Sequence, residues 1–221
     1  MVSRNVLIVS LLCAVLVSCK KEDPKVASAG TVVANLAFSN IDSSRFPWAA
    51  KMGDGMTKRW ELPIPVKTNG EVRAAAAMDA IEQRLGKIIF DRTSIESADE
   101  AAITRGIVLR KGTAYVPREE TNLNAYCANV SGAPLRGDYP EAFYDGATGV
   151  ISTRLYVNLD NRACTAKPDV VIHEFGHALG LGAHFDGFGN GDSISDAFWA
   201  ALITLYANPP GTRRGDVALA R

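Results

Sequence analysis

Apolar and polar positions follow a helical period in three stretches of the chain. The segment 69–86 is rich in alanine, carries apolar residues near a 3.6-residue spacing, and ends at Gly86. It therefore predicts an α-helix that stops at this glycine. A second helix is predicted from Pro168, because proline suits the first helical position. A third is predicted over residues 195–207, where a Pro-Pro pair follows and ends it.

Runs of β-branched and aromatic residues predict short strands between these helices. They are "KRWELPIPV", "KIIFDR", "GIVLRKG", "TAYVP", "AYCANV" and "GVISTRLYVNLD". Two prolines make the first of them an edge-like or irregular strand. Lys111 and Gly112 predict a hairpin turn between "GIVLRKG" and "TAYVP". Neither an internal repeat nor a second core is visible, so we expect one α+β domain over residues 45–221.

The N-terminus has the pattern of an export signal. A basic residue, Arg4, precedes an apolar run that is too short to span a bilayer, and Cys19 follows at once. The order Leu-Val-Ser-Cys resembles the lipobox of bacterial lipoproteins, which implies a signal peptide over residues 1–18 and a lipid on Cys19; an ordinary secretory signal is the alternative. We expect a tether over residues 19–44, disordered up to about Gly30, in which "TVVANLAF" forms a strand or part of the tether. The location implied is the bacterial cell envelope, on its periplasmic or surface face.

Composition narrows the function classes. The chain has 24 acidic and 24 basic residues among 221, so no net field would hold a polyanion, which argues against nucleic acid as a partner. With Cys13 in the signal peptide and Cys19 taken by the lipid, only Cys127 and Cys164 remain in a compartment that permits oxidation. We expect them to form a disulfide, with two buried free thiols as the alternative.

All three histidines of the chain fall within "HEFGHALGLGAH". On a helix, His173 and His177 lie one turn apart on the same face and can bind one divalent metal ion. Glu174 flanks that face, where its carboxylate can reach a water molecule on the metal without being a ligand. The alternative is a coincidental stripe of two structural histidines and an exposed glutamate.

A catalytic zinc site needs a third protein ligand and an open position for water. Gly180 and Gly182 let the chain stop its helix and turn back, which would bring His184 to the metal. Asp186 is the rival ligand, because a carboxylate oxygen also suits zinc.

The motif resembles the HExxHxxGxxH signature of the metzincin clan of zinc endopeptidases, and most of all its matrixin-like branch. His173, Glu174, His177 and Gly180 match, whereas the position of the third histidine holds Ala183 and His184 comes one residue later. Members of this clan carry a methionine turn beneath the metal. All four methionines of this chain lie upstream of the motif, so the turn is absent or rebuilt from other residues, for example within "FDGFGNGDSIS".

The resemblance implies a mixed twisted β-sheet, an active-site helix that carries HExxH, and a C-terminal helix. It also implies a zinc endopeptidase in which Glu174 activates a zinc-bound water, and whose extended peptide substrate lies antiparallel to an edge strand, here "TAYVPR" or "AYCANV". A metzincin-fold lipoprotein that binds without turnover is the main alternative, and a scaffold with a structural zinc is the second. Calcium is a lesser expectation: Asp186, Asn190 and Asp192 have calcium-loop intervals, but Phe188 stands where a ligand belongs.

Overall fold

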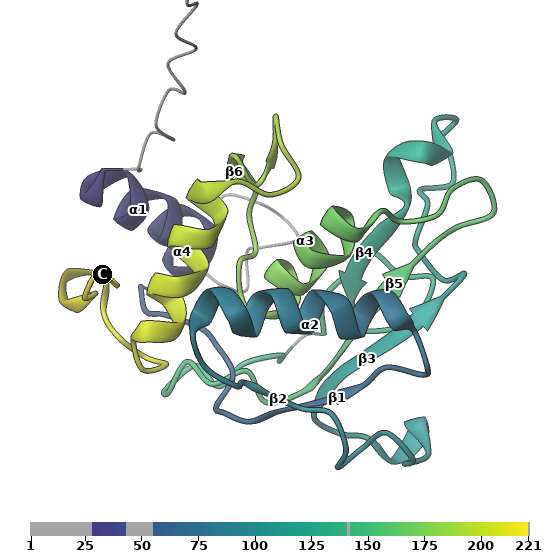
Figure 1. Cartoon of the computed structure of the whole chain (residues 1–221), viewed down its shortest axis with the longest axis horizontal. Coiled ribbons are helices and arrows are strands. Elements are labelled where there is room, and N and C mark those ends of the chain that lie inside the picture. The colour runs from purple at the N-terminus through teal and green to yellow at the C-terminus, as the bar shows by residue number, and fades with distance from the viewer. Residues whose placement is uncertain (1–27, 43–54, 141, 221) are drawn as a thin grey trace, which may run out of the picture.

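The computed structural model describes residues 28–42, 55–140 and 142–220. In this part of the chain a five-stranded sheet has the order β2-β1-β3-β5-β4, with α2 and α3 running side by side across it and α1 packed beside α4 at one end (Figure 1). The strands are β1 (Ile64–Lys67), β2 (Phe90–Asp91), β3 (Gly106–Lys111), β4 (Ala128–Ser131) and β5 (Arg154–Leu159). Two further short strands, β6 (Phe185–Asp186) and β7 (Gly189–Asn190), pair with each other.

The sheet is mostly parallel. The pairs β1–β2, β1–β3 and β3–β5 are parallel, and only β4 runs antiparallel, against β5. The mixed sheet with helices packed on it is consistent with the expected α+β class. β4, which contains the second half of "AYCANV", is an edge strand, whereas "TAYVPR" is not a strand.

The three helices predicted from the sequence are confirmed as α2 (Val72–Leu85), α3 (Pro168–Ala178) and α4 (Asp196–Ala207). Gly86 ends α2 with φ 65°, a conformation that glycine adopts without steric cost. Pro168 is the first residue of α3. The side chain of Ser195 accepts a hydrogen bond from the amide of Ala197 and caps α4.

The hydrophobic core lies between the helices and one face of the sheet. Successive strand residues point to opposite faces, so Ile107 and Leu109 join the main core, while Val108 and Tyr156 face the other way. On that second face they pack with Ile103 into a small separate cluster. The face that carries α2 and α3 is therefore the one that builds the site.

Two expectations from the sequence are wrong. Residues 29–41 form neither a strand nor a tether but the helix α1 (Ala29–Leu36), continued by a π-helical turn over Ala37–Ile41, because their apolar side chains recur at helical spacing and pack on α4. The hairpin at Lys111 and Gly112 does not form. β3 is already paired on both sides, with β1 and β5, so no free edge remains for a hairpin partner.

Of the predicted strand with two prolines, "KRWELPIPV", only the last three residues lie in a strand, and this strand is not at the edge. β1 lies between β2 and β3, and its pairing with β3 begins at Val66, one residue after Pro65. The residue without an N–H group therefore lies where no ladder bond to β3 is required.

Cys19, the expected signal peptide and most of the expected tether lie outside the described residues. Among the residues that the structure describes, none of the helices has the length and apolar character needed to cross a membrane.

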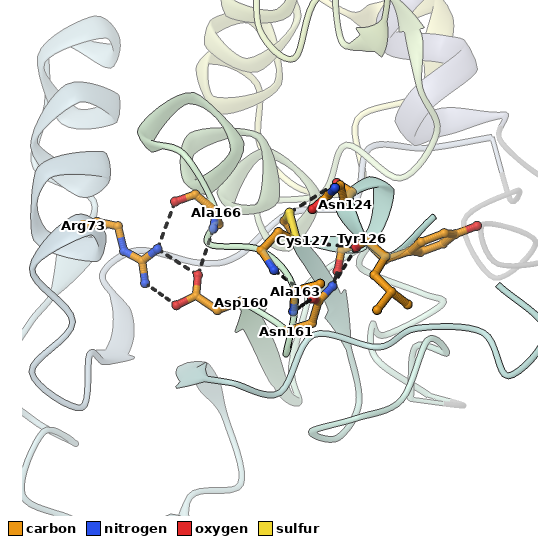
Figure 2. The surroundings of a disulfide bond; sticks show 10 residues. Arg73, Asn124, Tyr126, Cys127, Asp160, Asn161, Ala163 and Ala166 are labelled. Atoms are coloured by element: carbon orange, nitrogen blue, oxygen red, sulfur yellow. Dashed lines mark hydrogen bonds and ion pairs between the residues drawn. A yellow bond between two sulfur atoms is a disulfide. The ribbon is translucent and has the colours of Figure 1, made fainter. Parts of the chain in front are cut away.

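A disulfide joins Cys127 and Cys164, the two cysteines expected to pair. It links the start of β4 to the loop that leads into α3, and Figure 2 shows a second link to the same loop. There Arg73 of α2 donates to both carboxylate oxygens of Asp160 and to the carbonyl oxygen of Ala166. Asp160 in turn accepts from the amide of Ala166. These links fix the loop from which α3 starts.

We expect Arg73→Met to lower the free energy of unfolding by about 3 kcal/mol, because it leaves the nearly buried Asp160 carboxylate without its partner. Arg92→Met is the matched control. Arg92 bonds two carboxylates, but Asp79 is 68% exposed and Glu82 keeps its hydrogen bonds from the amides of Ile89 and Phe90. The loss of Arg92 should therefore cost less than about 1 kcal/mol. Urea denaturation of both variants measures the difference, and equal losses would contradict this account.

Candidate metal centre and active site

Helix α3 carries the three residues singled out by the HExxH spacing. All three are buried, although ionisable side chains normally remain in contact with water: His173 is 7% exposed, Glu174 6% and His177 8%. Gly176, between them, is required by close packing: a Cβ atom there would lie 2.6 Å from the ring of Phe198. Helix α3 is therefore tightly packed at the turn that carries both histidines.

The chain turns back after α3 and brings His184 to the other two histidines. Gly180 has φ 118°, which a side chain would strain, and a Cβ atom there would lie 2.4 Å from the carbonyl oxygen of Lys58. The Nε2 atom of His184 lies 3.1 Å from Nε2 of His173 and 3.1 Å from Nε2 of His177. The extra residue relative to the HExxHxxGxxH pattern therefore does not prevent the three rings from meeting.

Backbone carbonyl groups fix which nitrogen of each helical histidine faces the centre. His173 Nδ1 donates to the carbonyl oxygen of Ser193 at 2.8 Å, and His177 Nδ1 donates to that of Leu181 at 2.5 Å. Both Nε2 atoms are then unprotonated and point their lone pairs at His184 Nε2. A neutral His184 has one proton and can satisfy only one of them, whereas a cation at the centre satisfies all three. The three histidines could therefore hold a metal ion.

Burial sets the charge of these groups. Desolvation lowers the pKa of His173 to about 4 and also lowers the pKa values of His177 and His184, so the imidazoles are neutral at neutral pH and competent as ligands. Desolvation raises the pKa of Glu174 to about 8. A divalent cation beside this carboxyl group would favour its ionised form.

Phe188 packs against all three histidine rings. Its ring centroid lies 4.4 Å from that of His173, 4.8 Å from that of His177 and 5.6 Å from that of His184. On its other side it stacks on Phe198 at 5.1 Å. Phe188 belongs to "FDGFGNGDSIS", the segment in which a substitute for the methionine turn was expected. From the sequence alone, Phe188 was interpreted only as a misfit in a calcium loop, and this contact was not predicted.

The backbone beside Phe188 also fixes the third ring. A Cβ atom on Gly189 would lie 2.4 to 2.6 Å from three atoms of the His184 ring, so only glycine leaves room for the imidazole. Asp186, the rival third ligand, is exposed and lies outside the histidine cluster. Asn190 and Asp192 are exposed too.

A cavity of about 940 Å³ opens in front of the cluster. All three histidines and Glu174 line it, as do residues of the edge strand β4 and the disulfide. Tyr139 on the cavity wall is buried, and its pKa is raised by desolvation and, to a lesser degree, by the carboxylate of Glu174. A chain-like ligand could therefore lie beside β4 and reach the histidines.

Comparison with known proteins adds no assignment: this chain matches neither a family model, nor a curated protein, nor a solved structure.

Proposed function

We propose that this protein is a zinc-dependent endopeptidase. The observation that carries the proposal is the convergence of three imidazole Nε2 atoms beside the buried Glu174, at the wall of a cavity that an edge strand also lines. The resemblance of "HEFGHALGLGAH" to the metzincin signature supports the same reading.

The donor set fits zinc. Three neutral imidazoles with an open fourth position are a known catalytic arrangement for this ion. Nitrogens bound at about 2.0–2.1 Å to a tetrahedral ion lie about 3.3 Å apart, close to the 3.1 Å between His184 Nε2 and each of its two neighbours. All three rings line the cavity, so an ion that they held would be accessible to water and substrate from the cavity. The carbonyl oxygens of Leu181 and Ser193 hold the rings of His177 and His173 in this orientation.

Bound zinc would lower the pKa of a coordinated water and polarise a peptide carbonyl group. Glu174 is the general base in this proposal: its carboxylate accepts the proton of the attacking water and then delivers it to the leaving amine. A closed structural zinc site would have no use for this residue. A buried carboxyl group at the wall of an open cavity therefore favours hydrolysis over a scaffold role.

The substrate would be an extended peptide lying antiparallel to β4. This strand pairs only with β5 in the described sheet, and Ala128, Asn129 and Val130 line the cavity. Main-chain hydrogen bonds to a strand edge bind a peptide with little sequence selectivity. In this proposal a lipid on Cys19 holds the enzyme at a membrane of the bacterial envelope.

The test is zinc analysis and a cleavage assay on the full chain in detergent. We expect one zinc ion per chain, cleavage of a mixed peptide library, loss of cleavage when a chelator removes the metal, and recovery when zinc is restored. Zinc at a thousand times its dissociation constant should also stabilise the fold by about 4 kcal/mol. A chain that binds zinc but cuts no peptide would instead be a binding lipoprotein.

A further inference from the structure

The segment that was expected to be a tether touches the turn that carries the third histidine. The π-helical turn Ala37–Ile41 follows α1, and its residues Ser39 and Asn40 are fully buried. They lie against Gly180–Ala183, the stretch between α3 and His184. The two segments are about 140 residues apart in the sequence.

Four hydrogen bonds join them. Asn40 Nδ2 donates to the carbonyl oxygen of Gly180 at 2.6 Å. The carbonyl oxygen of Ser39 accepts from the amides of Gly182 and Ala183 at 2.8 and 3.3 Å. Ser39 Oγ donates to the carbonyl oxygen of Ala183 at 2.7 Å. The bonds enclose Leu181, whose carbonyl oxygen orients His177, and reach the residue before His184.

The partners are groups that a helix end leaves without intrahelical hydrogen bonds. The carbonyl oxygen of Ser39 lies in the last turn of its helix, where it has no intrahelical donor. The amides of Gly182 and Ala183 donate hydrogen bonds to it instead. In the same way the carbonyl oxygen of Gly180, just past the end of α3, accepts a hydrogen bond from the side chain of Asn40. Asn40 is itself held by Lys58, whose amide it accepts from and whose carbonyl oxygen it donates to.

We propose that Ser39 and Asn40 are positioning residues that hold the Gly180–Ala183 turn in its metal-binding form and thereby set the metal affinity of the three histidines. The proposal rests on the metal site of the proposed function. A turn with two glycines has much backbone freedom to lose when His184 binds. Bonds that order this turn beforehand remove that cost from the binding step. The π-helical turn Ala37–Ile41, which lies in the segment expected to be a tether, is then part of the metal site.

The test compares Asn40→Ala with Asn208→Ala in the full chain in detergent. Asn208 is a matched control: it is 3% exposed, its Nδ2 donates to two carbonyl oxygens, and its Oδ1 accepts from one amide, all at the C-terminal end of α4. Both variants lose similar bonds and should lose similar stability. Competition with a chelating dye, at a temperature where both are folded, should show zinc affinity about 10- to 100-fold weaker for Asn40→Ala, and within about twofold of the parent for Asn208→Ala.

A folded Asn40→Ala with the zinc affinity of the parent would overturn the proposal, and so would an equal loss in both variants. If Asn40→Ala does not fold, Ser39→Ala decides, because it removes only the bond from Oγ to Ala183. We expect it to weaken zinc binding severalfold and to reduce the intensity of the visible spectrum of the cobalt-substituted protein. An unchanged affinity and spectrum in that variant would also overturn the proposal.

Hydrogen exchange separates this proposal from the proposed function. The amide of Gly182 donates to Ser39, so without metal it should exchange faster in Asn40→Ala than in Asn208→Ala, relative to the amides of α2 in each variant. A parent chain with no zinc affinity would refute the proposed function. The exchange rate of the Gly182 amide in the two variants would still show whether Asn40 orders the Gly180–Ala183 turn. Equal rates in the two variants would refute this positioning role as well.

Discussion

Glu174→Gln is expected to lower the rate of peptide hydrolysis about 10³-fold while the protein keeps one zinc ion per chain. The amide has nearly the shape of the carboxyl group, so the packing around this buried side chain should persist. It cannot accept the proton of the attacking water, however, and general-base catalysis is lost. The three imidazole ligands are unchanged, so metal affinity should change little. Steady-state cleavage together with metal analysis of the same samples measures both quantities.

Glu82→Gln is the control for this substitution. Glu82 lies on α2 and its side chain is largely buried, but it does not line the cavity. Its Oε1 atom accepts from the amides of Ile89 and Phe90, a role that the amide oxygen of glutamine can keep. The control should retain full cleavage. If Glu174→Gln cleaved as fast as this control, Glu174 would not be the base and the hydrolytic mechanism would fail.

The helices and the pairing of the two helical histidines could be predicted because their signals are local. The spacing of His173 and His177 places them on one helical face whatever surrounds them. Gly86 and Pro168 mark a helix end and a helix start through their own backbone preferences. The return of His184 was predictable in outline, since two glycines precede it. Its distance to the other rings depends on tertiary contacts.

The errors arose where a local pattern competed with a distant partner. Lys111 and Gly112 have the composition of a hairpin turn, but β3 pairs with β1 and β5 instead. In residues 29–41, the β-branched pair Val32 and Val33 favoured a strand. The apolar positions that turn out to be buried, Val32, Leu36, Ala37 and Ile41, are four, one and four residues apart, which is a helical spacing that was overlooked.

The contacts that hold the three histidines in place could not be predicted from sequence patterns. The carbonyl groups of Leu181 and Ser193 are present whatever the side chain, so no residue type reveals that they orient His177 and His173. Phe188 packs against the three histidine rings because the chain folds back on itself after His184. A single aromatic residue in a glycine-rich segment gives no sign of such a contact.

The second large effect is expected at the third ligand, where His184→Ala should weaken zinc binding about 10²- to 10³-fold. Structural zinc sites with four ligands bind with about 10–16 kcal/mol, so one ligand contributes roughly 2.5 to 4 kcal/mol. His184 is only partly buried, so the fold itself should tolerate the change. Its loss leaves two imidazoles on α3, which make a weak site on their own.

Asp186→Ala provides the comparison, because Asp186 was the competing candidate and lies two residues further along the chain. Its side chain is exposed and outside the histidine cluster, so zinc affinity should stay within about twofold of the parent. Equilibrium competition with a chelating dye measures both variants under the same conditions. Metal loss in Asp186→Ala with retention in His184→Ala would reassign the third ligand. It would also require the turn after Gly180 to adopt a different path, since the present one places the His184 ring against the backbone of Gly189.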